Sequence, residues 1–202
     1  MSGKQSYHHG DLRSALLQAA RDILEEGGLD ALSLRAVAAR AGVSHAAPAH
    51  HFPTLKNLLT AVAIDAFQRF TTAMRDERDQ AASDPRSQLA AAGDGYVRFA
   101  RQYPQQFRLM FSPSRLDWTE AGFHDAGRAA YAQLQEVCAP VAELRGDTSQ
   151  DGRLKLEQMV WSSVHGYVQL LLAGQFGYPY DGSPEPPPRP DIEGLLLGAK
   201  GN

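Results

Sequence analysis

Apolar residues recur at helical spacing along most of the chain. Between residues 11 and 26 they fall three, four and seven positions apart, which predicts an amphipathic helix closed by Gly27 and Gly28. The same spacing after Pro53 predicts a long helix that reaches Asp79. Further helices are predicted over residues 86–102, 105–111, 117–143, 152–174 and 192–197. Because no segment alternates as a strand does, we predict an all-α fold.

Residues typical of helix ends divide this pattern early in the chain. Ser33 is a good N-cap for a helix that ends at Gly42, a residue suited to the left-handed conformation that terminates helices. Ser44 then caps a second short helix that we expect to run to about His51. Pro48 is expected to be tolerated there, in a first turn that lacks backbone partners. The segment therefore predicts a helix-turn-helix.

The late part of the chain contains a different kind of segment. Residues 177–190 hold six of the twelve prolines, which predicts an extended loop before the last short helix. The only cysteine, Cys138, lies in an apolar stretch, so we interpret it as a small buried hydrophobe.

Composition limits the function classes. The formal net charge of −3 gives no global attraction for phosphate, so any nucleic-acid binding must be local. No apolar run is long enough to span a bilayer and the first ten residues are polar, so we expect no membrane partner and a cytoplasmic location. We find no phosphate-binding loop and no nucleophile motif, and we therefore expect no enzyme activity and no cofactor.

Histidine is concentrated at the start, with five of seven in the first 51 residues. His8 and His9 lack a third ligand at a set spacing, and a polar lead-in to a helix explains them better than a metal site. His50 and His51 are adjacent and do not share a helical face. We therefore predict no metal site.

The helix-turn-helix sequence Leu34-Arg-Ala-Val-Ala-Ala-Arg-Ala-Gly-Val-Ser44 lies between two further motifs. It is preceded by Tyr7-His-His-Gly-Asp-Leu-Arg13 and followed by His45-Ala-Ala-Pro-Ala-His-His-Phe-Pro53. Together these residues resemble the TetR family of transcription regulators. Later in the chain, Trp161-Ser-Ser-Val-His165-Gly166 resembles the Trp-His-Gly (WHG) class of TetR C-terminal domains.

The resemblance implies a domain organisation and a function. It implies a three-helix DNA-binding head over residues 1–54 and a larger helical body over residues 55–202 that binds a ligand and forms a homodimer. We expect a repressor that a small apolar effector releases from double-stranded operator DNA. The alternative is a dimeric interaction or ligand-binding protein whose DNA binding is weakened or lost.

The same resemblance places the DNA contacts. Ser44, His45 and Ala47 are expected at base edges or the adjacent backbone, and Arg35 and Lys56 at phosphates. His50 and His51 are further candidates in the recognition segment. The sequence departs from the family pattern here, because Ala49 replaces the usual Tyr, His50 the usual basic or polar residue, and Leu55 the usual Lys.

Effector contacts are expected from apolar and aromatic residues of the body, because the family implies an apolar pocket there. The candidates are Phe107, Phe111, Trp118, Trp161 and His165. Such residues more often form core, and His165 is either a ligand or proton-carrying group or a core histidine bonded to a neighbour. Trp161 and His165 are four residues apart and should nearly touch.

Overall fold

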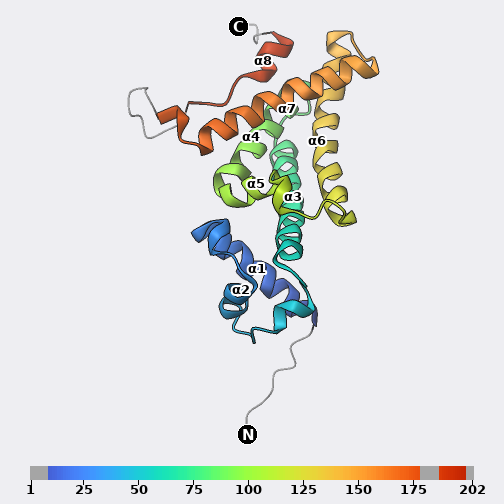
Figure 1. Cartoon of the computed structure of the whole chain (residues 1–202). Helices are drawn as coiled ribbons and strands as arrows, with labels where there is room; N and C mark the ends of the chain where they lie inside the picture. Colours follow the sequence, from blue (N-terminus) through green and yellow to red (C-terminus); the bar gives the residue numbers. More distant parts are fainter. Residues whose placement is uncertain (1–8, 178–186, 199–202) are drawn as a thin grey trace. The chain divides into compact units, whose positions relative to one another are not determined.

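The computed structural model describes residues 9–177 and 187–198. Within these ranges the backbone forms eight α-helices and four short 3₁₀ helices, and it contains no strand (Figure 1). The predicted all-α fold is therefore confirmed. His8 lies outside the described residues, as do residues 178–186 of the segment for which we predicted an extended loop.

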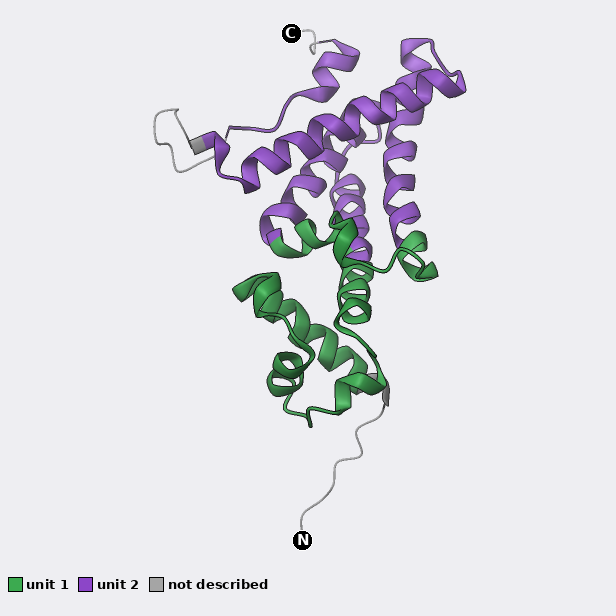
Figure 2. Cartoon of the chain, in the orientation of Figure 1, with its two compact units in different colours: residues 1–66, 105–125 green, residues 67–104, 126–202 purple. Residues whose placement is uncertain are grey.

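The chain divides into two compact units (Figure 2). Unit 1 consists of residues 1–66 and 105–125, and its fully buried side chains include Leu16, Leu24 and Val37. Its complete elements are α1 (His9–Gly27), η1 (Leu29–Ala31), α2 (Leu34–Arg40), η2 (Ala47–His50) and η3 (Pro113–Arg115). It also holds most of α5 (Pro104–Met110) and the first parts of α3 (Leu55–Gln80) and α6 (Ala121–Arg145).

Unit 2 consists of residues 67–104 and 126–202. It contains the remainder of α3 and α6 together with α4 (Pro85–Gln102), α7 (Gln150–Leu172), η4 (Gln175–Gly177) and α8 (Ile192–Leu197). Helix α4 packs against both α7 and α8. Asp84 and Ser149 cap α4 and α7 by accepting from the backbone N–H three residues later, at 3.0 Å in each case.

A glycine allows α3 and α4 to approach closely within unit 2. A Cβ atom placed on Gly95 would lie only 2.5 Å from the carbonyl oxygen of Ala73 and 2.6 Å from Cα of Met74. Both of these atoms belong to backbone and cannot swing away. Gly95 is therefore required by packing, although its own backbone angles are ordinary for a helix.

Arg78 joins three helices of the same unit. Its side chain donates to Gln133 Oε1 and Glu136 Oε2 on α6, both at 2.8 Å, and to Gln88 Oε1 on α4 at 3.1 Å. The Gln88 amide donates in return to the carbonyl oxygen of Arg78 at 2.9 Å. The guanidinium fork thus fixes the end of α3 against α4 and α6.

The predicted helices agree with the observed ones apart from two segments. The long helix predicted after Pro53 is α3, with 26 residues, and the last short helix is α8. The helix predicted from residue 117 begins only at Ala121, because Asp117 forms a side-chain turn in which it accepts from Thr119 N and Oγ1 at 3.0 and 2.7 Å. The second difference lies in the recognition segment.

The compact units do not follow the domain division predicted after residue 54. Helix α3 contributes to both units, and residues 105–125 group with the N-terminal helices. The functional boundary between a DNA-binding head and a body remains a prediction.

Candidate nucleic-acid interface and effector region

Helix α2 begins and ends as its sequence predicts. The Ser33 side chain accepts from Ala36 N at 3.1 Å, which satisfies a donor that the helix itself cannot pair. At the other end Gly42 has φ +68°, and Val43 N donates to the carbonyl oxygen of Ala38 at 3.0 Å. This left-handed glycine ends α2 and redirects the chain into the segment that we expect to contact DNA.

The predicted α-helix over residues 44–51 is wrong in type. The structure has a turn at His45 and Ala46 followed by the 3₁₀ helix η2. Pro48 stands four residues after Ser44, so its missing N–H removes the first i to i−4 hydrogen bond that such a helix would make. Ala47 N instead donates to the carbonyl oxygen of Ser44, three residues back, at 3.0 Å.

Two buried residues hold this segment in unit 1. Pro48 is buried, and its carbonyl oxygen accepts from the N–H groups of His51 at 3.0 Å and Phe52 at 2.8 Å. The Phe52 ring is 2% exposed and lies beneath the Arg13 guanidinium, with Cζ 5.4 Å from the ring centroid. These contacts fix the base of the segment and leave its outer side chains in solvent.

The predicted recognition residues mostly occupy that outer surface. Ser44, His45, Ala49 and His50 are exposed, whereas Ala47 and His51 are half-buried. The histidines on this surface are therefore accessible to a phosphate or a base edge. At Ala49, where the family usually has a Tyr, only a methyl group reaches the surface.

The cationic side chains on the neighbouring helices α2 and α3 differ in whether a carboxylate of the chain already holds them. Arg35 on α2 and Lys56 on α3 are both exposed. Arg40 is instead paired with Glu26, with 2.5 Å between Nη2 and Oε2, and this hydrogen-bonded pair raises the pKa of Arg40 and lowers that of Glu26. Arg35 is thus the cation on α2 better placed for an external anion.

Lys56 has a carboxylate in its neighbourhood. Hydrogen bonds from Thr119 lower the pKa of Asp117, and the charge of Lys56 lowers it further. The negative charge of Asp117 therefore partly offsets the positive potential of Lys56 within unit 1. Leu55, where the family usually has a Lys, is half-buried and supplies no charge.

The candidate effector residues fall into two groups, one in each unit. Phe107, Phe111 and Trp118 belong to unit 1, whereas Trp161 and His165 belong to unit 2. Phe107 is fully buried and its ring lies 5.1 Å from that of the half-buried Phe111. Trp118 is 47% exposed, donates from Nε1 to the carbonyl oxygen of Pro113 at 2.8 Å, and packs edge-on against Phe123 at 5.1 Å.

Trp161 and His165 lie next to each other on α7, as their spacing predicts, with ring centroids 6.4 Å apart. His165 Nδ1 is 2.7 Å from the Tyr96 hydroxyl on α4, and its Nε2 is 3.0 Å from the Gln169 amide. Burial raises the pKa of Tyr96 and lowers that of His165, so both are neutral near pH 7. Both imidazole nitrogens thus have neighbours within the fold, and a role of His165 in binding a ligand stays a prediction.

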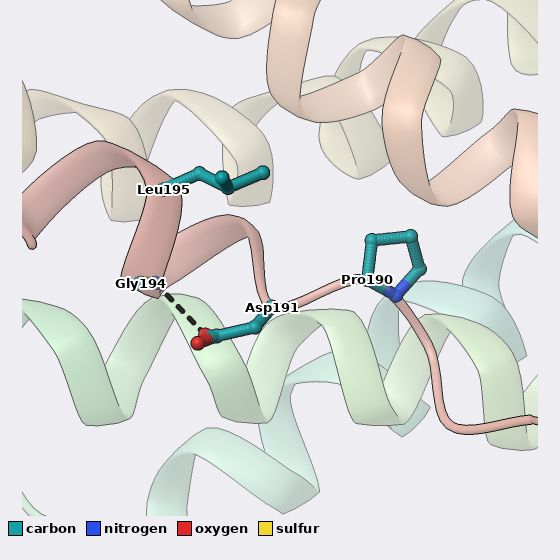
Figure 3. Close-up of a pocket in the computed structure, with 4 residues that line it drawn as sticks. All are labelled: Pro190, Asp191, Gly194 and Leu195. Carbon is teal, nitrogen blue, oxygen red and sulfur yellow. Dashed lines mark hydrogen bonds between the residues drawn. The ribbon is translucent and has the colours of Figure 1, made fainter. Parts of the chain in front are cut away.

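An open hollow in unit 2 lies at the beginning of α8. Pro190, Asp191, Gly194 and Leu195 line it (Figure 3). Asp191 Oδ1 accepts from Gly194 N at 2.8 Å and thereby caps α8, so this carboxylate is already used in the fold. None of the four residues was predicted from the sequence as an effector contact.

Two sequence profiles match the chain. Residues 16–62 match the profile described as bacterial regulatory proteins, tetR family, and residues 89–185 match the tetracyclin repressor-like C-terminal domain. The chain belongs to the TetR family. The first match covers the helix-turn-helix residues described above, and the second covers most of α4, all of α5 to α7, and the residues between them.

Solved structures similar to this TetR-family chain share its fold over most of their length. A protein of unknown function from Rhodococcus sp. RHA1 is 32% identical, with a TM-score of 0.74 over 96% of this chain and 93% of that one. The TetR family transcriptional regulator PfmR from Thermus thermophilus is 18% identical, with a TM-score of 0.57 and coverage of 90% and 92%. The multidrug binding protein EbrR, solved in complex with imidazole, is 16% identical, with a TM-score of 0.58 and coverage of 91% and 92%. No curated protein matches the chain significantly.

Over residues 9–177 and 187–198, no three side chains of His, Cys, Asp or Glu are grouped as a metal ion would need. No helix in the same ranges combines the length and the apolar character needed to cross a bilayer.

Three residues with structural roles in these regions were not singled out from the sequence. Gln169 stands four residues after His165, so the helical spacing that paired Trp161 with His165 could have found it. Arg13 and Glu25 contact residues distant in the sequence, and no local pattern of a TetR-family head signals those contacts.

Proposed function

We propose that this TetR-family protein is a homodimeric repressor that binds operator DNA through residues 44–51 and is released by a small apolar effector. The observation that carries the DNA-binding part is the surface formed by Ser44, His45 and His50. These side chains are exposed, while buried Pro48 and Phe52 hold the backbone beneath them. Direct readout of nucleobase edges requires polar side chains that face solvent from an ordered backbone.

The experiment starts from selection of duplexes out of a random DNA library by the purified protein. Affinity for a selected duplex is then measured against salt for the wild type, Arg35→Ala and Arg40→Ala. Loss of one phosphate contact should reduce the salt slope by about 0.9 in the first variant. Arg40→Ala removes the same charge from the same helix, but this guanidinium is held by Glu26, so its slope should stay near the wild-type value. Failure to select any duplex contradicts the proposal.

A second function is favoured by two specific residues. Ala49 presents only a methyl group and Leu55 presents no charge where the family usually has Tyr and Lys. These residues support the alternative of a dimeric interaction or ligand-binding protein with weakened DNA binding. The selection experiment separates the two functions, because only the repressor enriches a sequence.

The effector proposal rests on the partly accessible aromatic residues. Trp118 and Trp161 are 47% and 40% exposed, so both indoles can report a bound compound. Phe107, Phe111 and His165 are the remaining candidate contacts. Support also comes from EbrR, a relative in fold that is a multidrug binding protein. Bound effector should change tryptophan fluorescence and raise the melting temperature by mass action. A broad library of apolar compounds that changes neither signal, while DNA binding persists, argues against sensing.

The homodimer proposal rests on α7. Four large apolar side chains on this helix are exposed, namely Leu154 (46%), Met159 (44%), Trp161 (40%) and Leu170 (48%). Gly166 lies on the same helix, and a Cβ placed there meets no atom within 4 Å. At about 100° per residue, Met159, Gly166 and Leu170 fall on one side of α7, whereas Leu154 and Trp161 fall on another. The side around Gly166 therefore offers apolar groups and open space for a symmetric contact with a second copy.

Two finer assignments accompany this function. Trp161, His165 and Gly166 all lie on α7, which supports assignment of the body to the WHG class. A repressor of this kind acts in the cytoplasm, where its operator DNA is found.

A further inference from the structure

Glu157 of α7 is the one residue with a charged side chain that is buried in the described part of the chain, and only 8% of its surface is exposed. The other buried polar residues there are neutral, namely Thr60, Thr71, Gln106 and Gln133. A carboxylate that leaves water without a cation beside it carries a large desolvation cost. A positively charged partner would therefore stabilise Glu157.

The described residues supply only part of what this carboxylate needs. The Tyr131 hydroxyl of α6 donates to Glu157 Oε2 at 2.5 Å, and burial together with the charge of Glu157 raises the pKa of Tyr131 to about 12, so the phenol keeps its proton. No other described residue bonds to or pairs with Glu157. Oε1 accepts no hydrogen bond from these residues and is not fully enclosed. This oxygen is therefore open to a donor from outside the chain.

Aromatic rings lie beside this carboxylate. Trp161, one turn further along α7, is 40% exposed and packs edge-on against Tyr131, with 6.2 Å between ring centroids. Because an α-helix turns by about 100° per residue, Glu157 and Trp161 lie on the side of α7 away from Gly166, where we place the contact with a second copy. Indole and phenol rings attract cations through their faces. A carboxylate beside two such rings suits an organic cation better than a neutral compound.

We propose that Glu157, Tyr131 and Trp161 form a subsite for a positively charged nitrogen, so that the effector is an apolar compound carrying a protonated amine. The proposal rests on the effector function above and names the chemical class of the compound. The amine donates to Oε1 of Glu157 while the apolar part lies against Trp161. A neutral compound lacks the charge that offsets the buried carboxylate, and an acid places two negative charges together.

The experiment is titration calorimetry of the full chain at pH 7 with three compounds that share one ring system and differ in charge. They are naphthylmethylamine, which is a cation at this pH, naphthylmethanol, which is neutral, and naphthoate, which is an anion. The wild type should bind the amine roughly tenfold more tightly than the alcohol, the order expected for a hydrogen bond to a charged group, and naphthoate most weakly. In Glu157→Gln the amide oxygen still accepts from Tyr131, but the amine and the alcohol should bind with similar affinity.

Two control variants separate this role from a structural one. Glu143 is exposed on the same helix as Tyr131, so Glu143→Gln removes an equal charge from unit 2 and should keep the preference for the amine. Tyr131→Phe removes the phenol and leaves the carboxylate, so it should keep the preference as well. A Glu157 that only holds α7 to α6 through Tyr131 would lower stability in both Glu157→Gln and Tyr131→Phe and would leave the ranking of the compounds unchanged.

Each other outcome has a defined meaning. If the three compounds bind equally well, or if Glu157→Gln keeps the preference for the amine, the inference is wrong and the proposal of an apolar effector stands. If none of them binds the wild type, the subsite is rejected, and the broad library of apolar compounds decides separately on sensing. If Glu157→Gln lowers the proportion of dimer in light scattering and leaves the ranking unchanged, a lysine or arginine of a second copy fills the subsite and the inference is also wrong.

Discussion

Tyr96 on α4 and His165 on α7 are joined by a hydrogen bond with 2.7 Å between the phenol oxygen and Nδ1. Burial raises the pKa of the phenol, so Tyr96 keeps its proton and we infer that it donates to Nδ1. The Tyr96 ring also packs edge-on against Phe70, with 4.7 Å between centroids. The pair therefore connects the two helices by one polar contact set in apolar packing.

The first prediction concerns pH. Burial lowers the pKa of His165 below the ordinary value of 6.5, so the unfolded chain binds a proton at this site before the folded protein does. The stability that His165 contributes is therefore independent of pH well above 6.5, and it is lost as the pH drops through and below that value. We expect the melting temperature of the wild type to exceed that of His165→Gln at pH 8, and the gap to narrow at pH 5.5. A difference in melting temperature that is the same at both pH values would show that the pKa of His165 does not differ between the folded and unfolded chain.

Much of this fold could be predicted from the sequence because helical periodicity is a local signal. The stripe after Pro53 and the caps at Ser33 and Gly42 each involve residues within one or two turns, and all three features are observed. In the recognition segment the type of helix was mispredicted, and one residue explains the error. Pro48 is the first residue whose N–H would bond within an α-helix that begins at Ser44, and it has no N–H.

Contacts between distant residues could not be predicted in this way. Glu25 and Gln106 are 81 residues apart, and nothing local in an exposed-looking glutamate near a helix end indicates its partner. The sequence likewise did not indicate that the candidate effector residues belong to different compact units, Phe107, Phe111 and Trp118 to one and Trp161 and His165 to the other. Periodicity identifies the buried face of a helix but does not identify which helix covers it.

The second prediction compares two glycines in helices of unit 2. Gly95→Ala places a methyl group against the backbone of Ala73 and Met74, so α3 and α4 must separate, at a cost of about 1–3 kcal/mol. Gly127→Ala on α6 is the control, because a Cβ there meets nothing within 4 Å. It should stabilise the helix by roughly 0.5–1 kcal/mol. Chemical denaturation of both variants tests the pair, and a neutral Gly95→Ala would mean that the helices are not in close contact.

The third prediction concerns assembly through α7. Gly166→Leu adds a large side chain where the single chain has open space, so the fold of one copy should persist. A symmetric interface centred on this glycine would instead be forced apart. Light scattering at micromolar concentration should show a dimer for the wild type and for Gly166→Ala, and a shift toward monomer for Gly166→Leu. A wild-type protein that runs as a monomer rejects the dimer.

The fourth prediction follows from the histidines on the recognition surface. Affinity for DNA falls with salt by about 0.9 log units per log unit of salt for each phosphate neutralised. Few fixed cations lie beside residues 44–51, so the slope should be shallow at pH 8. Leu55→Lys should steepen it and strengthen binding if the missing family lysine is a lost phosphate contact.

Acid should reveal a second source of positive charge at that surface. His45 and His50 are exposed and His51 is half-buried, so their imidazole rings can meet a phosphate. A bound phosphate favours the protonated ring, so a shift from pH 8 to pH 6 should tighten binding to a selected duplex and steepen the salt slope. The double variant His50→Gln with His51→Gln should lose most of this pH effect while its binding at pH 8 changes little. Since acid also acts on His165 in unit 2, unfolding must be monitored at pH 6 in the same samples. Equal slopes at the two pH values in folded wild-type protein would show that these histidines do not meet phosphate.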